Sequence, residues 1–292
     1  MQRFVDLTLN GISNGAIYAA VALSLVLIWR ATRILNFAQA GMLMLTTFIA
    51  WALIDSGASY VVGFVAALVS GLVLGAVVER VVIRPIEGGP ELNPIIVTLG
   101  LLILIEAVAG MIWGGNPKGF PPAFSIRGYR IGGHSLFFAP NDLFIVIVVA
   151  VMLAALVLLF RGTSLGLQMR ASAFAPEVSR LLGVRVGHMF TAGWALASMA
   201  GSLAGVLVAP SVFVAPSNFD SVLVFGFTAA VLGGLESPPG AVVGGVVLGV
   251  ALSYVSGYAG ASLVTLGALV ILVATLMVRP NGLFAAARSR RV

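Results

Sequence analysis

Cysteine is absent from this chain, and lysine occurs once, at Lys118. Without cysteine there is no disulfide framework, no thiolate metal site and no cysteine nucleophile. The single lysine lies outside any G-x-x-x-x-G-K-[ST] pattern, so the chain has no phosphate-binding loop of an ATPase. The two histidines, His134 and His188, lack the spacing of a metal pair or of a serine hydrolase. We therefore expect no enzyme activity, no metal and no cofactor bound by this chain.

Charge is also scarce: 9% of the 292 residues are charged and 60% are hydrophobic. A soluble domain is typically about a quarter charged, because its surface faces water. Apolar runs of roughly 20 residues, enough to cross about 30 Å of hydrocarbon, recur along the chain. Backbone groups in lipid must pair internally, so these runs are helices. The predicted fold class is all-α: a polytopic transmembrane helical bundle whose outer surface meets the lipid bilayer.

Apolar segments predict about eight or nine spans. They fall at about 8–30, 34–54, 59–82, 93–113, 142–160, 188–210, 219–235, 239–256 and 260–278. The second, and the two that meet around Gly233 to Gly244, are short or interrupted. Gly233-Gly234 and Pro238-Pro239-Gly240 are typical either of a broken or re-entrant helix or of a plain turn between spans.

The remaining segments are loops of one transmembrane domain that covers residues 1–292. The loop at about 114–141 is rich in Gly, Pro and aromatic residues, and we expect a short hairpin or an interfacial helix there. The loop at about 161–187 reads as a structured cytoplasmic element, and 285–292 as a basic cytoplasmic tail. No small-residue cleavage site follows the first span, so we expect that span to be retained.

Positive residues predict the orientation, because cytoplasmic loops carry an excess of Lys and Arg. Twelve of the 16 basic residues fall on one side of the predicted spans. They are Arg30, Arg33, Arg80, Arg84, Arg161, Arg170, Arg180, Arg185, Arg279, Arg288, Arg290 and Arg291. This side is therefore cytoplasmic, with the N-terminus outside. The formal net charge of +6 does not indicate nucleic acid, because the basic residues do not cluster with aromatics on a soluble module.

Residues 176–183 are predicted to form a short helix within the cytoplasmic loop. Pro176 suits a first helical position and Gly183 suits the position after a helix. Glu177 and Arg180 lie at the ends that the helix dipole favours. Its apolar face consists of Val178, Leu181 and Leu182. Two turns are too short to be stable alone, so this helix either docks into a groove of a partner or lies on lipid headgroups.

Glu106 is an ionisable residue near the middle of the span that runs from Ile95 to Trp113. Such groups are costly at membrane depth and need a reason. Glu106 either faces a pore, where it meets solute or a gating partner, or bridges two helices as a protonated or hydrogen-bonded carboxyl. No basic residue lies at a similar depth in any span, which favours a neutral or water-solvated group over an ion pair.

Other polar residues complete a candidate translocation path. Asn36 and Gln39, three apart on the second span, either line that path or satisfy the backbone of a discontinuous helix. The amide of Asn14 and the hydroxyl groups of Tyr18 and Thr98 are candidates for the path or for contacts between helices. The full candidate set is Asn14, Tyr18, Asn36, Gln39, Thr98 and Glu106. Small-xxx-small pairs at Gly11/Gly15, Gly71/Gly75, Gly201/Gly205, Gly240/Gly244 and Gly245/Gly249 predict close helix–helix contacts.

Sequence stretches in the cytoplasmic loop and along the chain resemble the permease family of branched-chain amino acid ABC transporters. In the loop these are Arg170-Ala171, Ala173, Pro176-Glu177 and Leu181-Leu182-Gly183. Elsewhere they are Asn10-Gly11 through Gly15-Ala16-Ile17-Tyr18-Ala19, Leu35-Asn36-Phe37-Ala38-Gln39, Arg84-Pro85, Thr98-Leu99-Gly100-Leu101, Val231-Leu232-Gly233-Gly234-Leu235, Gly240 to Gly245, and Arg279-Pro280-Asn281-Gly282-Leu283-Phe284. The sequence departs from the family pattern at Ala40-Gly41, Ala175, Val178-Ser179, Glu236 and Pro239.

The resemblance implies a permease subunit of an importer in a bacterial inner membrane. Its partners would be a second permease, a paralogue, two cytoplasmic ATPase subunits that bind the ATP, and a periplasmic or lipid-anchored solute-binding protein. The ATPase-coupling residues would be Arg170, Ala171, Pro176, Glu177, Arg180, Leu181, Leu182 and Gly183. The resemblance implies a branched-chain or related small amino-acid-like solute, and because the family also includes relatives that move urea and short amides, it does not fix which one. The alternative is a proton-coupled secondary transporter or channel that works through Glu106.

Overall fold

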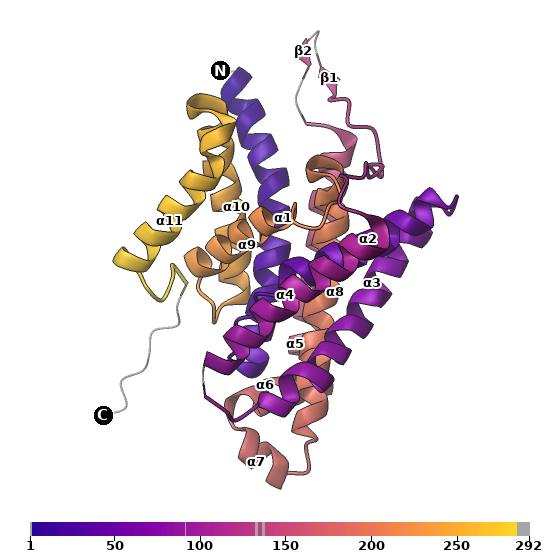
Figure 1. Cartoon of the computed structure of the whole chain (residues 1–292). Coiled ribbons are helices and arrows are strands. Elements are labelled where there is room, and N and C mark those ends of the chain that lie inside the picture. The colour runs from indigo at the N-terminus through magenta and orange to yellow at the C-terminus, as the bar shows by residue number, and fades with distance from the viewer. Residues whose placement is uncertain (1, 91, 132–133, 136–137, 285–292) are drawn as a thin grey trace.

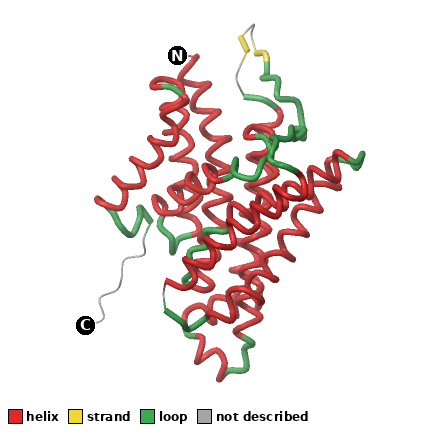
Figure 2. The backbone as a smooth tube through the Cα atoms, viewed as in Figure 1, coloured by secondary structure: helices red, strands yellow, loops and turns green. Residues whose placement is uncertain are grey.

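The computed structural model describes residues 2–90, 92–131, 134–135 and 138–284, and nearly all of this backbone is helical (Figures 1 and 2). The helices are α1 (Gln2–Thr32), α2 (Gln39–Asp55), α3 (Tyr60–Val77), α4 (Leu92–Trp113), α5 (Pro140–Gly162), α6 (Ser164–Phe174), α7 (Pro176–Leu181), α8 (Val186–Val212), α9 (Asp220–Gly233), α10 (Pro238–Tyr254) and α11 (Val264–Val278). A π-helical turn, Val78–Ile83, and a 3₁₀ turn, Arg84–Ile86, extend α3; Val255–Ala259 and Ala261–Leu263 join α10 to α11 in the same way.

Seven helices within the described residues are long and apolar enough to cross a membrane. Two of the nine predicted segments are shorter: α2 has 17 residues and α9 has 14. At 1.5 Å per residue these helices are about 25 and 21 Å long, less than the hydrocarbon thickness of about 30 Å. A polytopic helical bundle is therefore what the structure contains, while the count of eight or nine spans is not confirmed.

The core of the bundle lies along α1 and α8, whose middle sections are buried, whereas α4 and α11 have mostly exposed apolar surfaces. Helix α1 contacts α8, α9 and α10, and α8 contacts α2 and α3. Trp194 and Phe48 are among the largest fully buried side chains. Because the exposed helices are as apolar as the buried ones, the outward faces of α4 and α11 suit hydrocarbon and not water.

Glycines allow the closest helix contacts. A Cβ atom added to Gly249 of α10 would lie 2.3 Å from the Cα atom of Gly15 and 2.4 Å from the carbonyl oxygen of Gly11, both on α1. Likewise, a Cβ on Gly75 of α3 would lie 2.4 Å from the carbonyl oxygen of Trp194 on α8. The close approach predicted from small-xxx-small spacing is confirmed at these pairs, because only a hydrogen fits between the backbones.

Gly233 to Gly240 form a turn between two helices. Helix α9 ends at Gly233, Gly234 adopts a positive φ of 103°, and the Ser237 hydroxyl accepts a hydrogen bond of 3.1 Å from the Gly240 amide at the start of α10. The interruption is therefore a turn that separates α9 from α10. The short C-terminal stretch covers the turn: the amides of Leu283 and Phe284 donate to the carbonyls of Leu232 (2.9 Å) and Gly233 (3.2 Å).

The N-terminus and the β1–β2 hairpin lie at one end of the bundle, and α6 and α7 lie at the other (Figure 1). Strands β1 (Arg130–Ile131) and β2 (His134–Ser135) pair antiparallel, so the loop at 114–141 contains the short hairpin, one of its two predicted forms. Lys118 forms a backbone bridge to Val214, which fastens this loop to the segment between α8 and α9. The basic tail predicted at 285–292 lies outside the described residues.

Candidate translocation path and coupling surface

The helical structure is interrupted between α1 and α2 at residues 33–38, and the buried side-chain amides of Asn36 and Gln39 stabilise the interruption. The Asn36 side chain donates to the Gln39 side-chain oxygen at 3.0 Å and accepts from the Ala38 amide at 3.1 Å. Gln39 donates in turn to the carbonyl of Ala197 on α8 at 3.5 Å. The sequence placed both residues on the second span, which was wrong for Asn36. It lies in the break because its side chain closes a turn onto its own backbone.

Asn14 and Tyr18 lie four residues apart on α1 and face different partners. The Asn14 amide donates to the Asn10 side chain at 2.7 Å. The Tyr18 ring packs on Phe225 of α9, with ring centroids 5.1 Å apart. Thr98 of α4 is buried and donates to the carbonyl of Pro94 one turn earlier, at 2.8 Å. Tyr18 is therefore the member of this group that joins two helices, whereas Thr98 is satisfied within its own helix.

Helices α1 and α9 run in the same direction. Tyr18 contacts Phe225, and a Cβ atom on Gly226 would meet Val21. Near the ends of both helices, Arg33 pairs with Glu236. The contacts therefore advance along both segments together, and Asp220, the first residue of α9, lies toward the same end of the helix pair as Asn14. Polar groups of α1 and α9 thus occur in the half of the bundle that contains the N-terminus.

Glu106 of α4 has a neighbour that the sequence did not reveal: its carboxyl group lies close to the carboxyl group of Asp220. Oε1 of Glu106 and Oδ1 of Asp220 are both buried and have no hydrogen-bond partner among the described residues. Gly110, one turn beyond Glu106, lies near Pro216, so the segment before α9 packs along α4. The pair therefore joins α4 to the start of the short helix α9.

A second buried carboxylate was also missed from sequence. Glu79, with a side chain only 2% exposed, accepts hydrogen bonds from Arg84 at 2.9 to 3.1 Å and from the Thr191 hydroxyl at 2.7 Å. Arg84 also donates to the carbonyl of Gly187 at 2.7 Å. The network ties the π-helical extension of α3 to the first turns of α8. The five-residue spacing of Glu79 and Arg84 gave no signal, because an ordinary α-helix places side chains three or four residues apart on one face.

Helices α6 and α7 form the surface at the opposite end of the bundle from the N-terminus. Helix α6 is anchored: a Cβ atom on Gly166 would lie 2.2 Å from the carbonyl oxygen of Leu159 on α5, and Met169 and Ser172 are buried. The Thr163 hydroxyl caps α6 by accepting from the Gly166 amide at 3.1 Å. The element is therefore fixed to the bundle at its base and not a free loop.

Helix α7 spans Pro176–Leu181, with Pro176 in its first turn, and Gly183 has φ of +83°, so the short helix is confirmed. Glu177 lies in its first turn and Arg180 in its last. The apolar side chains around it are strongly exposed: Phe174 is 88%, Leu181 87% and Leu182 78% exposed. Val178 adds to this surface. Residues 174–182 therefore present an apolar face with nothing over it in the described part of the chain.

A multi-pass helical membrane protein is the class that this arrangement defines, because seven of the described helices are long and apolar enough to cross a membrane. Comparison with known proteins gives the family. The sequence pattern of the "Branched-chain amino acid transport system / permease component" family matches residues 7–278, and the chain belongs to that family.

Individual relatives match over nearly the whole chain. The high-affinity branched-chain amino acid transport system permease protein LivH of Escherichia coli K12 is 28% identical, covering 96% of this chain and 95% of its own length. BraD of Pseudomonas aeruginosa is 27% identical over the same shares. A probable LivH permease of Methanocaldococcus jannaschii is 26% identical over 90% of this chain. The solved structure of PsaBC from Streptococcus pneumoniae in complex with Fab superposes with a TM-score of 0.49 and 14% identity, covering 96% of this chain and 91% of its own.

Proposed function

We propose that this chain is the permease subunit of an ATP-driven importer in a bacterial inner membrane. In this proposal residues 174–182 contact a cytoplasmic ATPase and transmit its movement to the bundle. The observation that carries the proposal is the exposed apolar surface of Phe174, Leu181 and Leu182 on a segment anchored to the bundle. Burial of one such side chain contributes about 1.5–3 kcal/mol. Three exposed together favour a partner protein whose groove accepts a short helix.

Because α6 is anchored to the bundle, a force on this surface can be transmitted to the membrane-spanning helices. Gly166 lies directly against the end of α5, and Met169 is within reach of Gly193 on α8. A force on α7 therefore reaches α5 and α8 through packed contacts instead of through a flexible loop. Rocking of these helices by ATP-driven closure of two ATPase subunits would open the path alternately to each side. Solute would enter from a binding protein at the β1–β2 end.

The solute proposed is a branched-chain or related small amino-acid-like molecule. The named relatives transport branched-chain amino acids, and the polar groups along the candidate path are few. A path of this kind suits release as well as entry, because a site that binds strongly would retain its solute. Most of the selectivity would then lie in the solute-binding protein. The second permease of the complex is proposed to be a paralogue.

The test compares Glu177→Arg with Glu87→Arg. Both glutamates are exposed, and both lie in cytoplasmic segments of the predicted orientation, but only Glu177 is on α7. Coexpressed with its partner subunits and reconstituted, Glu177→Arg is expected to lower solute uptake per ATP hydrolysed at least about tenfold, with membrane insertion unchanged. Glu87→Arg should behave as wild type. Normal uptake and normal ATPase co-purification in Glu177→Arg would refute the role of α7.

One observation favours the rival function, a proton-coupled secondary transporter or channel. The neighbouring carboxyl groups of Glu106 and Asp220 lie on two helices, and a carboxyl pair at membrane depth is the kind of group that proton-coupled carriers use. Reconstitution of this chain without ATPase subunits decides between the two functions. Under our proposal a pH gradient alone drives no solute accumulation. Accumulation that follows the gradient and disappears in Glu106→Gln would establish the rival.

A further inference from the structure

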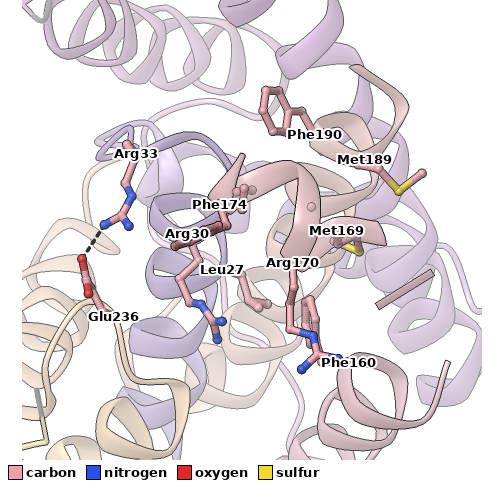
Figure 3. A pocket seen from close by; sticks show the side chains of 13 residues that line it. Leu27, Arg30, Arg33, Phe160, Met169, Arg170, Phe174, Met189, Phe190 and Glu236 are labelled. Atoms are coloured by element: carbon pink, nitrogen blue, oxygen red, sulfur yellow. Dashed lines mark hydrogen bonds and ion pairs between the residues drawn. The ribbon is translucent and has the colours of Figure 1, made fainter. Parts of the chain in front are cut away.

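A cavity of about 190 Å³ opens where α1, α5, α6 and α8 converge near the cytoplasmic end of the bundle (Figure 3). Its polar lining consists of three guanidinium groups and one carboxylate: Arg30 from the end of α1, Arg33 directly after it, Arg170 from α6, and Glu236 from the α9–α10 turn. The cavity is many times larger than the space that one water requires. It therefore has room for a ligand.

The positive charges in this cavity are only partly compensated. Arg33 and Glu236 form an ion pair of 2.5 Å. Arg30 is attracted by Glu236 and repelled by Arg170 and Arg33. Among the described residues no carboxylate forms an ion pair with Arg30 or Arg170; the side chain of Arg170 donates to the carbonyl of Gly166 at 3.4 Å. Three positive charges thus share the cavity with one negative charge.

Figure 3 shows how the two arginines without carboxylate partners are placed. The side chains of Arg30 and Arg170 extend in the same direction, away from the Arg33–Glu236 pair, and Leu27 and Phe160 lie beside them. Guanidinium forks match the oxygens of phosphate and bind them with charge-assisted hydrogen bonds. Leu27 and Phe160 offer apolar contact next to that charge.

We propose that this cavity is a binding site for a phosphate group, held between Arg30 of α1 and Arg170 of α6. Two sources supply this chemistry: the headgroup of an anionic phospholipid and a soluble phosphate. A bound phosphate would join the base of the α6–α7 segment to the central helix α1. Binding itself does not depend on the proposed function, whereas an effect of binding on ATPase coupling does.

The test measures binding to the purified full chain in a neutral detergent. Native mass spectrometry would titrate short-chain phosphatidylglycerol, with short-chain phosphatidylcholine as the neutral-headgroup comparison, and inorganic phosphate would be added as a competitor. Phosphatidylglycerol is expected to bind at least about tenfold more tightly than phosphatidylcholine. Arg30→Gln and Arg170→Gln are each expected to weaken its binding about tenfold, as loss of a hydrogen bond to a charged group implies.

Two further variants keep the result interpretable. Arg80→Gln removes an exposed arginine that does not line the cavity, and it should leave binding unchanged. Glu236→Gln removes the only carboxylate among the cavity's described lining residues and should tighten binding, an effect that a damaged fold would not produce. Competition by inorganic phosphate would identify the soluble source, and its absence the lipid source.

The proposal is overturned if neither phosphatidylglycerol nor phosphate binds, or if Arg80→Gln weakens binding as much as Arg30→Gln. It is also overturned if the cavity variants lose ATPase co-purification while phosphate binding is unchanged, because the arginines would then belong to a protein interface. A failure of the α7 test with intact phosphate binding would refute the proposed function and leave this site standing.

Discussion

Glu79 accepts three hydrogen bonds from Arg84, and through the Thr191 hydroxyl it also fastens α3 to α8. The carboxylate is almost completely buried, while the arginine side chain is one third exposed. Removal of one partner of a buried pair leaves the other charge without compensation. The pair therefore stabilises the π-helical turn at which α3 departs from regular α-helical geometry.

The first prediction concerns this pair. Glu79→Gln keeps the shape of the side chain but removes its charge, so we expect a loss of about 3 kcal/mol in the free energy of unfolding. Equilibrium unfolding in detergent by SDS titration would measure the loss. Glu87→Gln, at an exposed position, is the matched control and should change stability by less than about 0.5 kcal/mol. Equal stability of the two variants would contradict a structural role for Glu79.

The second prediction concerns Glu106 and Asp220. Glu106→Leu removes the carboxyl group that lies beside Asp220 and should cost about 1–3 kcal/mol, whereas replacement of both carboxyls by leucine should cost less than the sum of the single changes. A double-mutant cycle on unfolding free energies measures this coupling. Additive effects would show that the two side chains do not interact in the folded protein.

The third prediction concerns the seam between α1 and α10. Gly249→Ala places a methyl group 2.3 Å from the Cα atom of Gly15, and overpacking of this kind costs typically 1–3 kcal/mol. Gly100→Ala on α4 meets nothing within 4 Å and should be neutral or stabilising, since alanine favours helix more than glycine does. Thermal melting of the two variants in detergent compares them directly. Equal melting temperatures would show that the seam can relax.

The fourth prediction concerns the apolar surface of α7. Leu181→Asp places a charge where we expect an ATPase to bury an apolar side chain, so co-purification of the ATPase subunits should fall at least about tenfold. Leu92→Asp makes the same change at an exposed position at the start of α4, outside the α6–α7 segment of the chain. It should leave co-purification intact. Similar losses in both variants would indicate general damage to the bundle.

Local patterns predicted the parts of the fold that local chemistry determines. Pro176 and Gly183 bound a short helix because one suits its first turn and the other tolerates a positive φ. The spacing of Gly245 and Gly249 predicted a close contact, although not its partner, because the spacing describes one helix surface only. For the same reason the arrangement of the spans around α1 and α8 could not be derived from the chain.

The candidate site was predicted less completely. Glu106 was found because a carboxyl in the middle of an apolar run is conspicuous, but Asp220 was not, since it is the first residue of its helix and lies 114 positions away in the chain. Asn36 was placed on a helix, because the apolar pattern continues through the break that its side chain stabilises. Glu79 was overlooked, since the π-helical turn that brings it to Arg84 has no simple sequence signature.

The backbone contacts of Leu283 and Phe284 determine where this protein can be labelled. Their two hydrogen bonds hold the stretch after α11 against the turn that carries Glu236, and Gly282 fits directly against Gly234. An affinity tag or fluorophore should therefore be attached beyond Phe284. A truncation that ends before Leu283 would remove the hydrogen bonds that hold the turn. It would therefore alter the charge balance around Arg33 without changing Arg33 or Glu236.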